Sequence, residues 1–515
     1  MIQRLASFTG TAALTVKILV MAVLNALLVW MLMAAIGKGS NGLAVAISLV
    51  LVALNAVYFS KRAIPMKFLL PGSIFLLAFV VTPVGTTLYM SVFNYQTGNE
   101  ITKSAAIDGI IANGITADPN EEATYYLTIG ESQDELAGLV TRDLDQSVWL
   151  GTADGLTELP AGSYTLGSDG SAVSTPGFKP LNDDEVVARA DEIAALRMPF
   201  GDGSFLTPEL PYAVKQIQSL EYDEATDTFR DTVTGEKYVD NGNGNFALES
   251  DPDTKLDPGW RAFNGFFNYT SLLQDPTIRG PFISVAIWTF AFAFLSVLSM
   301  FAFGLLLAIA LDKPFRGRTV YRSILILPYA IPSFMSILIW NGLFNTNFGA
   351  VNVLLGEQID WYNDPWLARF VVILVNLWLG IPYFYLISSG ALQSIPGELE
   401  EAAAIDGATP KQAFRLIKLP LLLQVLSPLL IASFAFNFNN FNIVYLLTGG
   451  GPTDVLSGEV AGATDLLITY TYKTAIGYQY QNFGLASAIS TLVFLIVGAL
   501  SLWSLRRSKL VEIER

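Results

Sequence analysis

The sequence predicts an all-α polytopic membrane protein, with eight transmembrane helices and a mixed α/β external domain inserted between helices 3 and 4. The first observation is composition: 52% of the 515 residues are apolar and 15% are charged, whereas about a quarter of a soluble domain is charged. The second is a set of eight apolar stretches, each able to span a bilayer as a helix of about 20 residues. The third is a hydrophilic segment, residues 94–280, between the third and fourth stretches.

The eight apolar stretches define the predicted spans. We interpret the first as an uncleaved anchor, because it is longer than the apolar part of a typical signal peptide and no convincing cleavage site follows it. The predicted spans are Ile18–Ile36, Gly42–Ser60, Phe68–Phe93, Pro281–Leu311, Ser323–Phe344, Phe370–Leu392, Leu421–Leu447 and Phe483–Leu505.

Basic residues gather in every second loop between the spans and after the last span. Because lysine and arginine mark the cytoplasmic side of a membrane protein, we expect both termini in the cytoplasm and residues 94–280 outside it. The basic residues that set this topology are Lys61, Arg62, Lys67, Lys313, Arg316, Arg318, Arg322, Lys411, Arg415, Lys418, Arg506, Arg507, Lys509 and Arg515.

The hydrophilic insert carries the negative charge of the whole chain. It holds 32 acidic and 11 basic residues, a net charge of −21, whereas the rest of the chain has a net charge of +6. Alternation in Thr124–Ile129 predicts a strand, and Thr228–Val239 predicts a hairpin turning near Gly235. Asp184–Leu196 predicts an amphipathic helix. We therefore expect three parts: spans 1–3 in residues 1–93, the external domain in 94–280, and a membrane core of spans 4–8 in 281–515.

Several function classes are excluded by the residues that the sequence lacks. It has no cysteine and no histidine, so thiol nucleophiles, disulfides, thiolate or imidazole metal sites and histidine bases are ruled out. A net charge of −15 argues against nucleic acid as a partner. The acidic stretches 240–249 and 251–257 fit solvated turns better than calcium loops, because glycine or lysine stands at ligand positions. Spans 3–8 contain no carboxylate, which disfavours an ion-driven carrier.

Two helical faces in the spans combine amides with aromatic rings. In span 7 the face is Ser433, Phe436, Asn437 and Asn440, and in span 6 it is Asn376, Leu379, Gly380 and Tyr383. One interpretation is hydrogen bonding between helices, with Gly380 allowing close approach. The other is a site for a neutral polar solute, since amides bind hydroxyls and flat rings cover the apolar face of a sugar. Kinks are expected at Pro328, Pro332 and Pro382.

The cytoplasmic segment 394–420 predicts two short helices that meet at a glycine. Pro396 and the carboxylates of Glu398, Glu400 and Glu401 favour a helix start. Gly407 favours its end. Thr409 and Pro410 then form an N-cap and first-turn pair, and Pro420 is expected to close the second helix. Such a compact loop beside the membrane is suited to docking in a groove of a partner.

The same segment resembles the EAA motif of ABC importer permeases at every signature position, which implies a permease of the type I ABC importer fold. In that family the loop is a coupling helix seated in a cleft of the ATPase subunit, which implies that Glu401 contacts a basic residue there and Gly407 permits the turn. The matching residues are Glu401, Ala402, Ala403, Asp406, Gly407, Ala408, Phe414, Ile417, Leu419 and Pro420.

The resemblance extends along nearly the whole chain to the larger permease subunits of maltose/maltodextrin importers, the MalF type. It is carried by Leu325–Phe334, Ala432–Phe441 and Leu446–Pro452, together with the eight spans and the external domain after span 3. The resemblance implies a bacterial inner-membrane subunit with a periplasmic domain that contacts a sugar-binding protein. It implies a second, six-span permease (MalG type) and two ATPases (MalK type), which bind ATP and Mg²⁺, with no cofactor on this chain.

The resemblance also implies that maltose or a maltodextrin binds at the two helical faces described above, namely Asn376, Leu379, Gly380, Tyr383, Ser433, Phe436, Asn437 and Asn440. A different neutral oligosaccharide is an alternative substrate, because Leu377, Ile381 and Asn442 flank these positions. Two further hypotheses for the function are an ion-driven sugar carrier and a membrane-tethered sensor or glycan enzyme acting through the insert.

Overall fold

The computed structural model describes residues 10–507 except 61–63, 313, 454–459 and 478–480, and it divides into two units, residues 1–89 and 90–515. Of the basic residues used for the topology, Lys61, Arg62, Lys313, Lys509 and Arg515 lie outside the described residues. Among the described residues, seven helices are long and apolar enough to cross a membrane, and one bent helix pair makes an eighth candidate. The prediction of a polytopic helical protein with a mixed α/β insert is therefore confirmed.

The first unit contains three apolar helical segments: α2 (Thr11–Gly37), α3 (Asn41–Phe59), and a third formed by α4 (Ile64–Leu76), a π-helical turn η1 (Leu77–Val81) and α5 (Thr82–Met90). Asn25 of α2 and Asn55 of α3 exchange two amide hydrogen bonds of 3.0 and 2.7 Å. An unpaired amide is costly in an apolar medium, so this reciprocal pair fixes the register of α2 against α3.

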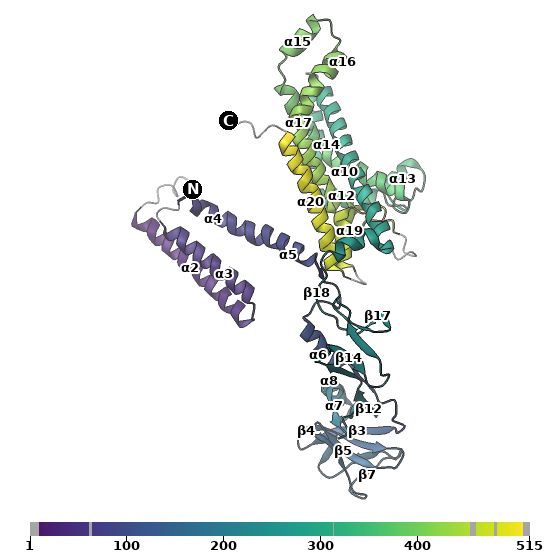
Figure 1. Ribbon diagram of the computed structural model, residues 1–515. Helices are drawn as coiled ribbons and strands as arrows, with labels where there is room; N and C mark the ends of the chain where they lie inside the picture. The colour runs from purple at the N-terminus through teal and green to yellow at the C-terminus, as the bar shows by residue number, and fades with distance from the viewer. Residues whose placement is uncertain (1–9, 61–63, 313, 454–459, 478–480, 508–515) are drawn as a thin grey trace. The chain divides into compact units, whose positions relative to one another are not determined.

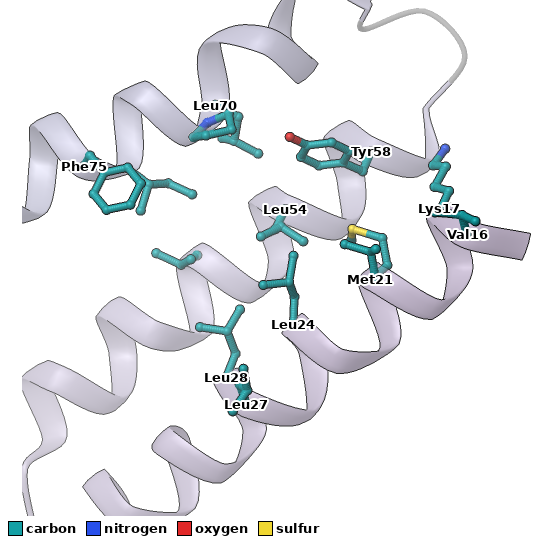
Figure 2. A pocket seen from close by; sticks show the side chains of 14 residues that line it. Val16, Lys17, Met21, Leu24, Leu27, Leu28, Leu54, Tyr58, Leu70 and Phe75 are labelled. Atoms are coloured by element: carbon teal, nitrogen blue, oxygen red, sulfur yellow. The ribbon is translucent and has the colours of Figure 1, made fainter. Parts of the chain in front are cut away.

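The first unit also holds an apolar cavity of about 680 Å³ between α2, α3 and α4 (Figure 2). Twelve of its fourteen lining residues are apolar. The two polar ones, Lys17 and Tyr58, lie at one end, and the Tyr58 hydroxyl donates to the carbonyl of Lys67. The walls therefore offer almost no hydrogen-bonding groups to a hydroxyl-rich solute.

The external domain begins and ends at a two-stranded antiparallel ladder of β1 (Phe93–Asn94) and β18 (Ala262–Phe263). Residues 115–218, all of them described, form a nine-stranded antiparallel sheet around Tyr125, Leu127, Val140 and Met198, together with the small β7–β8 hairpin. Their elements are β2 (Ile115–Ala117), β3 (Tyr125–Ser132), β4 (Glu135–Arg142), β5 (Val148–Thr152), β6 (Gly155–Glu158), β7 (Thr165–Leu166), β8 (Ala172–Ser174), β9 (Phe178–Pro180), α7 (Asp183–Ala188), α8 (Ala190–Ala195), β10 (Met198–Pro199), β11 (Phe205–Glu209) and β12 (Tyr212–Gln218).

A second sheet covers α6 (Lys103–Asn113), with Ala106 and Ile110 packed against Phe229 and Phe246. Lys103 bonds to both Asp227 and Asp240 at 2.6 Å. Burial alone would lower the pKa of Lys103, but these carboxylates more than offset it and the pKa is raised. The strands, in the fully described stretch 220–255, are β13 (Leu220–Asp223), β14 (Thr228–Asp231), β15 (Lys237–Asp240), β16 (Phe246–Leu248) and β17 (Asp251–Lys255).

Local predictions for the insert are confirmed in most details. Thr124–Ile129 falls on β3, and β14 pairs with β15 around Gly235, whose φ is +76°. The single helix expected over Asp184–Leu196 is wrong, because Arg189 leaves helical geometry at a ψ of 22° and separates α7 from α8. Residues 267–280, grouped above with the external domain, are helical, and Leu272 packs in the permease core beside Val285.

The permease core is a helical bundle in which α10 and α14 pack along most of their length. Close approach is possible because Gly304 lies against Phe384, whose Cβ is 2.6 Å from where a Cβ on Gly304 would lie. Figure 1 shows α15 and α16 at the end of this bundle that is farther from β18. Its elements are α9 (Phe267–Gln274), α10 (Pro276–Ala310), α11 (Arg318–Ile326), η2 (Leu327–Ala330), α12 (Ser333–Leu343), α13 (Ala350–Leu355), α14 (Pro365–Ser394), α15 (Glu398–Ile405), α16 (Pro410–Ala413), η3 (Phe414–Lys418), α17 (Leu419–Phe438), α18 (Phe441–Leu447), α19 (Leu467–Ile476) and α20 (Phe483–Arg507).

Prolines explain the two main departures from the predicted spans. The fifth span is a broken pair, Arg318–Ala330 and Ser333–Leu343, bent by 96°, because Pro328 and Pro332 remove two backbone donors within one turn. Pro420 does not close a helix: the chain stays helical from Pro410 to Phe438. The π-helical turn η3 ends at Lys418, so that Leu419 separates it from Pro420, with the Leu419 N–H bonded to the Phe414 carbonyl. This wider turn accommodates the proline without a break.

Candidate functional site

All eight residues of the two predicted faces line one cavity of about 650 Å³ in the permease core. It lies between η2, α12, α14, α17 and α18, with Met300 contributed by α10. Its walls combine amides, hydroxyls and aromatic rings, and no lining residue carries a charged side chain within the described part of the chain. The cavity therefore favours an uncharged polar occupant.

Three amides from different elements form a hydrogen-bonded cluster on the wall of this cavity. Asn376 Nδ2 donates to Asn437 Oδ1 at 2.7 Å and to Ser296 Oγ of α10 at 3.0 Å. Asn437 Nδ2 donates to the Ser433 carbonyl at 2.8 Å. Asn440 Nδ2 approaches Asn376 Oδ1 at 3.4 Å. The cluster joins α10, α14 and α17 and satisfies amides that would be costly to leave unpaired in a membrane.

Asn440 reaches the cavity by a route that the sequence analysis did not predict. The helical face from Ser433 to Asn440 is wrong in its last member, because α17 ends at Phe438. Asn440 is the N-cap of α18, with its side-chain oxygen 3.5 Å from the Ile443 nitrogen. Asparagine is a favoured N-cap because its side chain accepts an unsatisfied backbone N–H.

Aromatic rings supply the apolar part of the cavity. The Phe436 side chain is 71% exposed, so its ring is available to an occupant rather than packed in the core. Tyr383 stands edge-on to Phe384, with ring centroids 5.2 Å apart. Tyr329 adds a third ring from the broken span. Such rings suit the C–H face of a sugar, while the amides suit its hydroxyls.

Gly380 serves helix packing as well as lining the cavity. A Cβ at Gly380 would overlap Met300 Sδ, and Met300 is itself buried in α10. The close helix approach expected at Gly380 is therefore present in the structure, and the assignment of Gly380 to a sugar site stays a prediction. Of the three flanking residues considered for sugar preference, Asn442 lines the cavity, whereas Leu377 and Ile381 are not among its lining residues.

The broken span forms a part of the cavity that the sequence does not predict. Kinks are expected at Pro328 and Pro332, but the backbone between these prolines includes a short 3-10 turn. This turn brings Pro328, Tyr329, Ile331 and Ser333 to the cavity wall. The useful signal was two prolines four residues apart within an apolar stretch, since a proline pair opens a membrane helix more than one proline does.

In the segment 394–420 one short helix, α15, is joined at Gly407, which has a φ of +80°, to α16, the first turn of the 29-residue helical stretch 410–438. The Thr409 hydroxyl accepts from the Gln412 backbone, and the Gln412 side chain accepts from the Thr409 N–H. Lys418 forms an ion pair with Glu400, which links α15 to the base of α17. Glu401 is exposed, and Ile405 at the tip is 86% exposed, so this end of the core has an uncovered surface.

Two family models match parts of the chain, and one solved structure shows a partial likeness. The family model of binding-protein-dependent transport system inner membrane components matches residues 300–508. The model for the N-terminal of the TM subunit in PBP-dependent ABC transporters matches residues 74–154. A bacterial ABC transporter that imports the acidic polysaccharide alginate has a TM-score of 0.41 at 22% identity, covering 49% of this chain and 85% of that chain.

Two similar relatives cover most of the chain. The maltose/maltodextrin transport system permease protein MalF of Vibrio vulnificus is 37% identical over 470 residues, 88% of this chain and 87% of the relative. MalF of Escherichia coli K12 is 34% identical over 473 residues, 88% of this chain and 89% of the relative.

The fold and these matches define a multi-pass inner-membrane permease of a binding-protein-dependent ABC importer. Such a permease is a transport subunit that works with a binding protein and other subunits, and ATP is hydrolysed on partners rather than on this chain. Within that class the chain belongs to the MalF family of maltose/maltodextrin permeases.

Proposed function

We propose that this chain moves maltose and maltodextrins across the inner membrane through the 650 Å³ cavity between α14, α17 and the broken span. The observation that carries the proposal is the uncharged lining, which pairs amides with an exposed aromatic ring. Amide groups can donate to and accept from sugar hydroxyls, and flat rings can cover the apolar sugar face. Both relatives described above are maltose/maltodextrin permeases by name.

Transport is coupled to ATP hydrolysis through the segment 394–420, in our proposal. Both cavity-bearing helices run directly into it: α14 ends at Ser394, and the helical rod from Pro410 leads to Ser433, Phe436 and Asn437. At about 1.5 Å per residue, this 29-residue rod is roughly 43 Å long. A displacement of the segment by closing ATPases would therefore reach the cavity through continuous helix.

The mechanism that follows is a population shift between inward- and outward-facing states. Glu401, Ala402, Ala403, Asp406, Gly407 and Ala408 form the proposed contact with the ATPase, and the Glu400–Lys418 pair keeps α15 moving with α17. The broken span supplies the part of the cavity wall most able to move, because its backbone bonds are interrupted at Pro328 and Pro332. ATP and Mg²⁺ bind the partner ATPases in this scheme, and this chain binds no cofactor.

The proposed assembly contains this chain, a MalG-type permease, two MalK-type ATPases and a periplasmic maltose-binding protein. Both termini are placed in the cytoplasm, by the distribution of basic residues. The acidic external domain is placed in the periplasm, where it contacts the binding protein. Support for this arrangement within the core comes from Figure 1, in which α15–α16 and β18 lie towards opposite ends of the helical bundle.

The test is reconstitution of the four components from one organism in proteoliposomes, with ATP-dependent uptake of radiolabelled maltose, maltotriose and unrelated neutral disaccharides. We expect maltose and maltotriose to enter only with ATP and binding protein. Preferential uptake of another neutral oligosaccharide would identify that sugar as the substrate instead, and accumulation driven by an ion gradient without ATP would overturn the proposal.

A variant pair tests the cavity itself. Tyr383→Ala is expected to weaken maltose binding by about 1–3 kcal/mol, through loss of a ring contact and a hydroxyl partner. Tyr445→Ala is the matched control, because Tyr445 stacks on Phe441 in α18 and is not among the lining residues. Equal effects of the two substitutions on maltose binding would show that the cavity is not the maltose site.

A further inference from the structure

Ser296 lies directly behind the amide cluster and joins it to α10. Its side chain is fully buried and is not among the residues that line the cavity. Its Oγ accepts a 3.0 Å hydrogen bond from Asn376 Nδ2. A hydroxyl that contacts a proposed sugar-binding residue, but is shielded from the cavity, can act on a ligand only through that residue.

The donors and acceptors of Asn376 can be counted from its partners. A carboxamide nitrogen has two hydrogens, and in Asn376 one is bonded to Ser296 Oγ and the other to Asn437 Oδ1. The nitrogen therefore has no hydrogen left for an occupant of the cavity. The Asn376 oxygen has only the long 3.4 Å approach of Asn440 Nδ2, so it retains capacity to accept.

The orientation of the Asn376 amide follows from a chain of hydrogen bonds that starts at a backbone carbonyl. Asn437 Nδ2 donates to the Ser433 carbonyl, which can only accept. The oxygen of Asn437 must therefore face Asn376, and the nitrogen of Asn376 must face Asn437. Ser296 completes the arrangement by holding the second hydrogen of the Asn376 nitrogen within the bundle.

We infer that Ser296 is a positioning residue for sugar binding: it holds the Asn376 carboxamide so that its oxygen, and not its nitrogen, is presented to a sugar hydroxyl. This inference rests on the proposed function of the cavity. Without the Ser296 hydroxyl, a buried N–H of Asn376 loses its partner, and the amide must rotate towards the cavity to recover one. The acceptor that the sugar needs is then displaced.

The experiment is a double-mutant cycle on the assembled transporter, purified without binding protein so that radiolabelled maltose in equilibrium dialysis reports only the permease site. The variants are Ser296→Ala, Asn376→Ala and the double substitution. Loss of one hydrogen bond predicts that Ser296→Ala weakens maltose affinity about three- to tenfold. In the Asn376→Ala background the same change is expected to have less than about a twofold effect, because its target is absent.

Thr289→Val is the matched control. Thr289 is another fully buried hydroxyl of α10, and it accepts a 2.9 Å bond from the Leu467 N–H away from the cavity. Its loss also leaves a buried N–H without a partner, yet we expect maltose affinity to stay within about twofold of wild type. The inference is overturned if Ser296→Ala lowers maltose affinity by the same factor in the wild-type and Asn376→Ala backgrounds. It is also overturned if Asn376→Ala weakens maltose binding but Ser296→Ala alone does not. Absence of maltose binding by the wild-type transporter would instead overturn the proposed cavity function on which the inference rests.

Discussion

Substitution of Gly380 by alanine tests whether this glycine is required for the packing of α14 on α10. A Cβ at Gly380 would overlap Met300 Sδ and lie 2.8 Å from both Met300 Cγ and Cε. Met300 is buried beside Val297 and Phe384, so its side chain can give way only towards the cavity that it lines. Overpacking of this kind costs about 1–3 kcal/mol.

The assay is the apparent melting temperature of the assembled transporter, which we expect to fall by several degrees for Gly380→Ala. Gly390→Ala is the matched control on the same helix, since a Cβ there would meet nothing within 4 Å. Alanine is the better helix former by about 1 kcal/mol, so the control is expected to be neutral or stabilising.

The reasoning is refuted by the behaviour of a second substitution. Met300→Ala removes the atoms that the new methyl group would meet, so the double variant Gly380→Ala/Met300→Ala should be more stable than the sum of the two single effects. Contacting residues typically show coupling of about 0.5–3 kcal/mol. Strict additivity would show that the Met300 contact does not explain the cost, and that Gly380 is needed for another reason.

Two further predictions concern the segment 394–420 and the external domain. Glu401→Ala should weaken docking of the ATPases about ten- to a hundredfold, as expected for a lost charged hydrogen bond, so maltose uptake should fall while basal ATP hydrolysis persists. Substitution of the neighbouring exposed residue, Glu398→Ala, is the control. Normal uptake by Glu401→Ala would contradict the coupling proposal. In the external domain, burial lowers the pKa of Lys215, but hydrogen bonds to Glu121 and Asp118 more than offset this effect, and the pKa is raised. Burial raises the pKa of Glu121, but hydrogen bonds from Ala123, Tyr125 and Lys215 outweigh it, and the pKa is lowered. These interactions of Lys215 with Glu121 and Asp118 therefore stabilise the domain at pH values above the ordinary pKa of Glu121, 4.5, and below that of Lys215, 10.5. Hydrogen exchange in β12, corrected for intrinsic rates, should be faster in Lys215→Met than in wild type at pH 7, and the difference should shrink as the pH falls through the pKa of Glu121. The exposed Lys179→Met is the control and should exchange like wild type over the same pH range.

The features predicted correctly from the sequence are those set by local signals. Hydropathy located the spans, because a bilayer requires an apolar helix of a certain length. The two helices of the segment 394–420 followed from Gly407 and Thr409, whose preferences for positive φ and for N-caps act within one turn. The hairpin at Gly235 followed for the same reason.

The incorrect predictions concern how far a proline disturbs a helix. Pro420 is expected to end a helix, yet a π-helical turn precedes it with one residue, Leu419, in between. The same arrangement occurs before Pro83, where Thr82 lies in between and its N–H bonds to the Leu77 carbonyl. A π-helical turn adds one residue to a helical turn and leaves no periodic trace in the sequence. By contrast, Pro328 and Pro332 produce a 96° bend, whose size depends on the packing around it.

The amide cluster explains why two opposed interpretations of the same residues were both reasonable. Helical spacing alone could not separate hydrogen bonding between helices from binding of a polar solute. In the structure the hydrogen bonds between helices fall on the Asn376 nitrogen, which bonds to Ser296 and Asn437, and the Asn376 oxygen retains the capacity to accept that our proposal assigns to sugar binding. Besides the local bond of Asn437 to the Ser433 carbonyl, the contacts that assign these atoms join residues 61 and 80 positions apart in the chain, separations that no local pattern reports. On the proposed function, pairing the Asn376 nitrogen within the bundle leaves the oxygen to the ligand and avoids an unpaired donor in the apolar core.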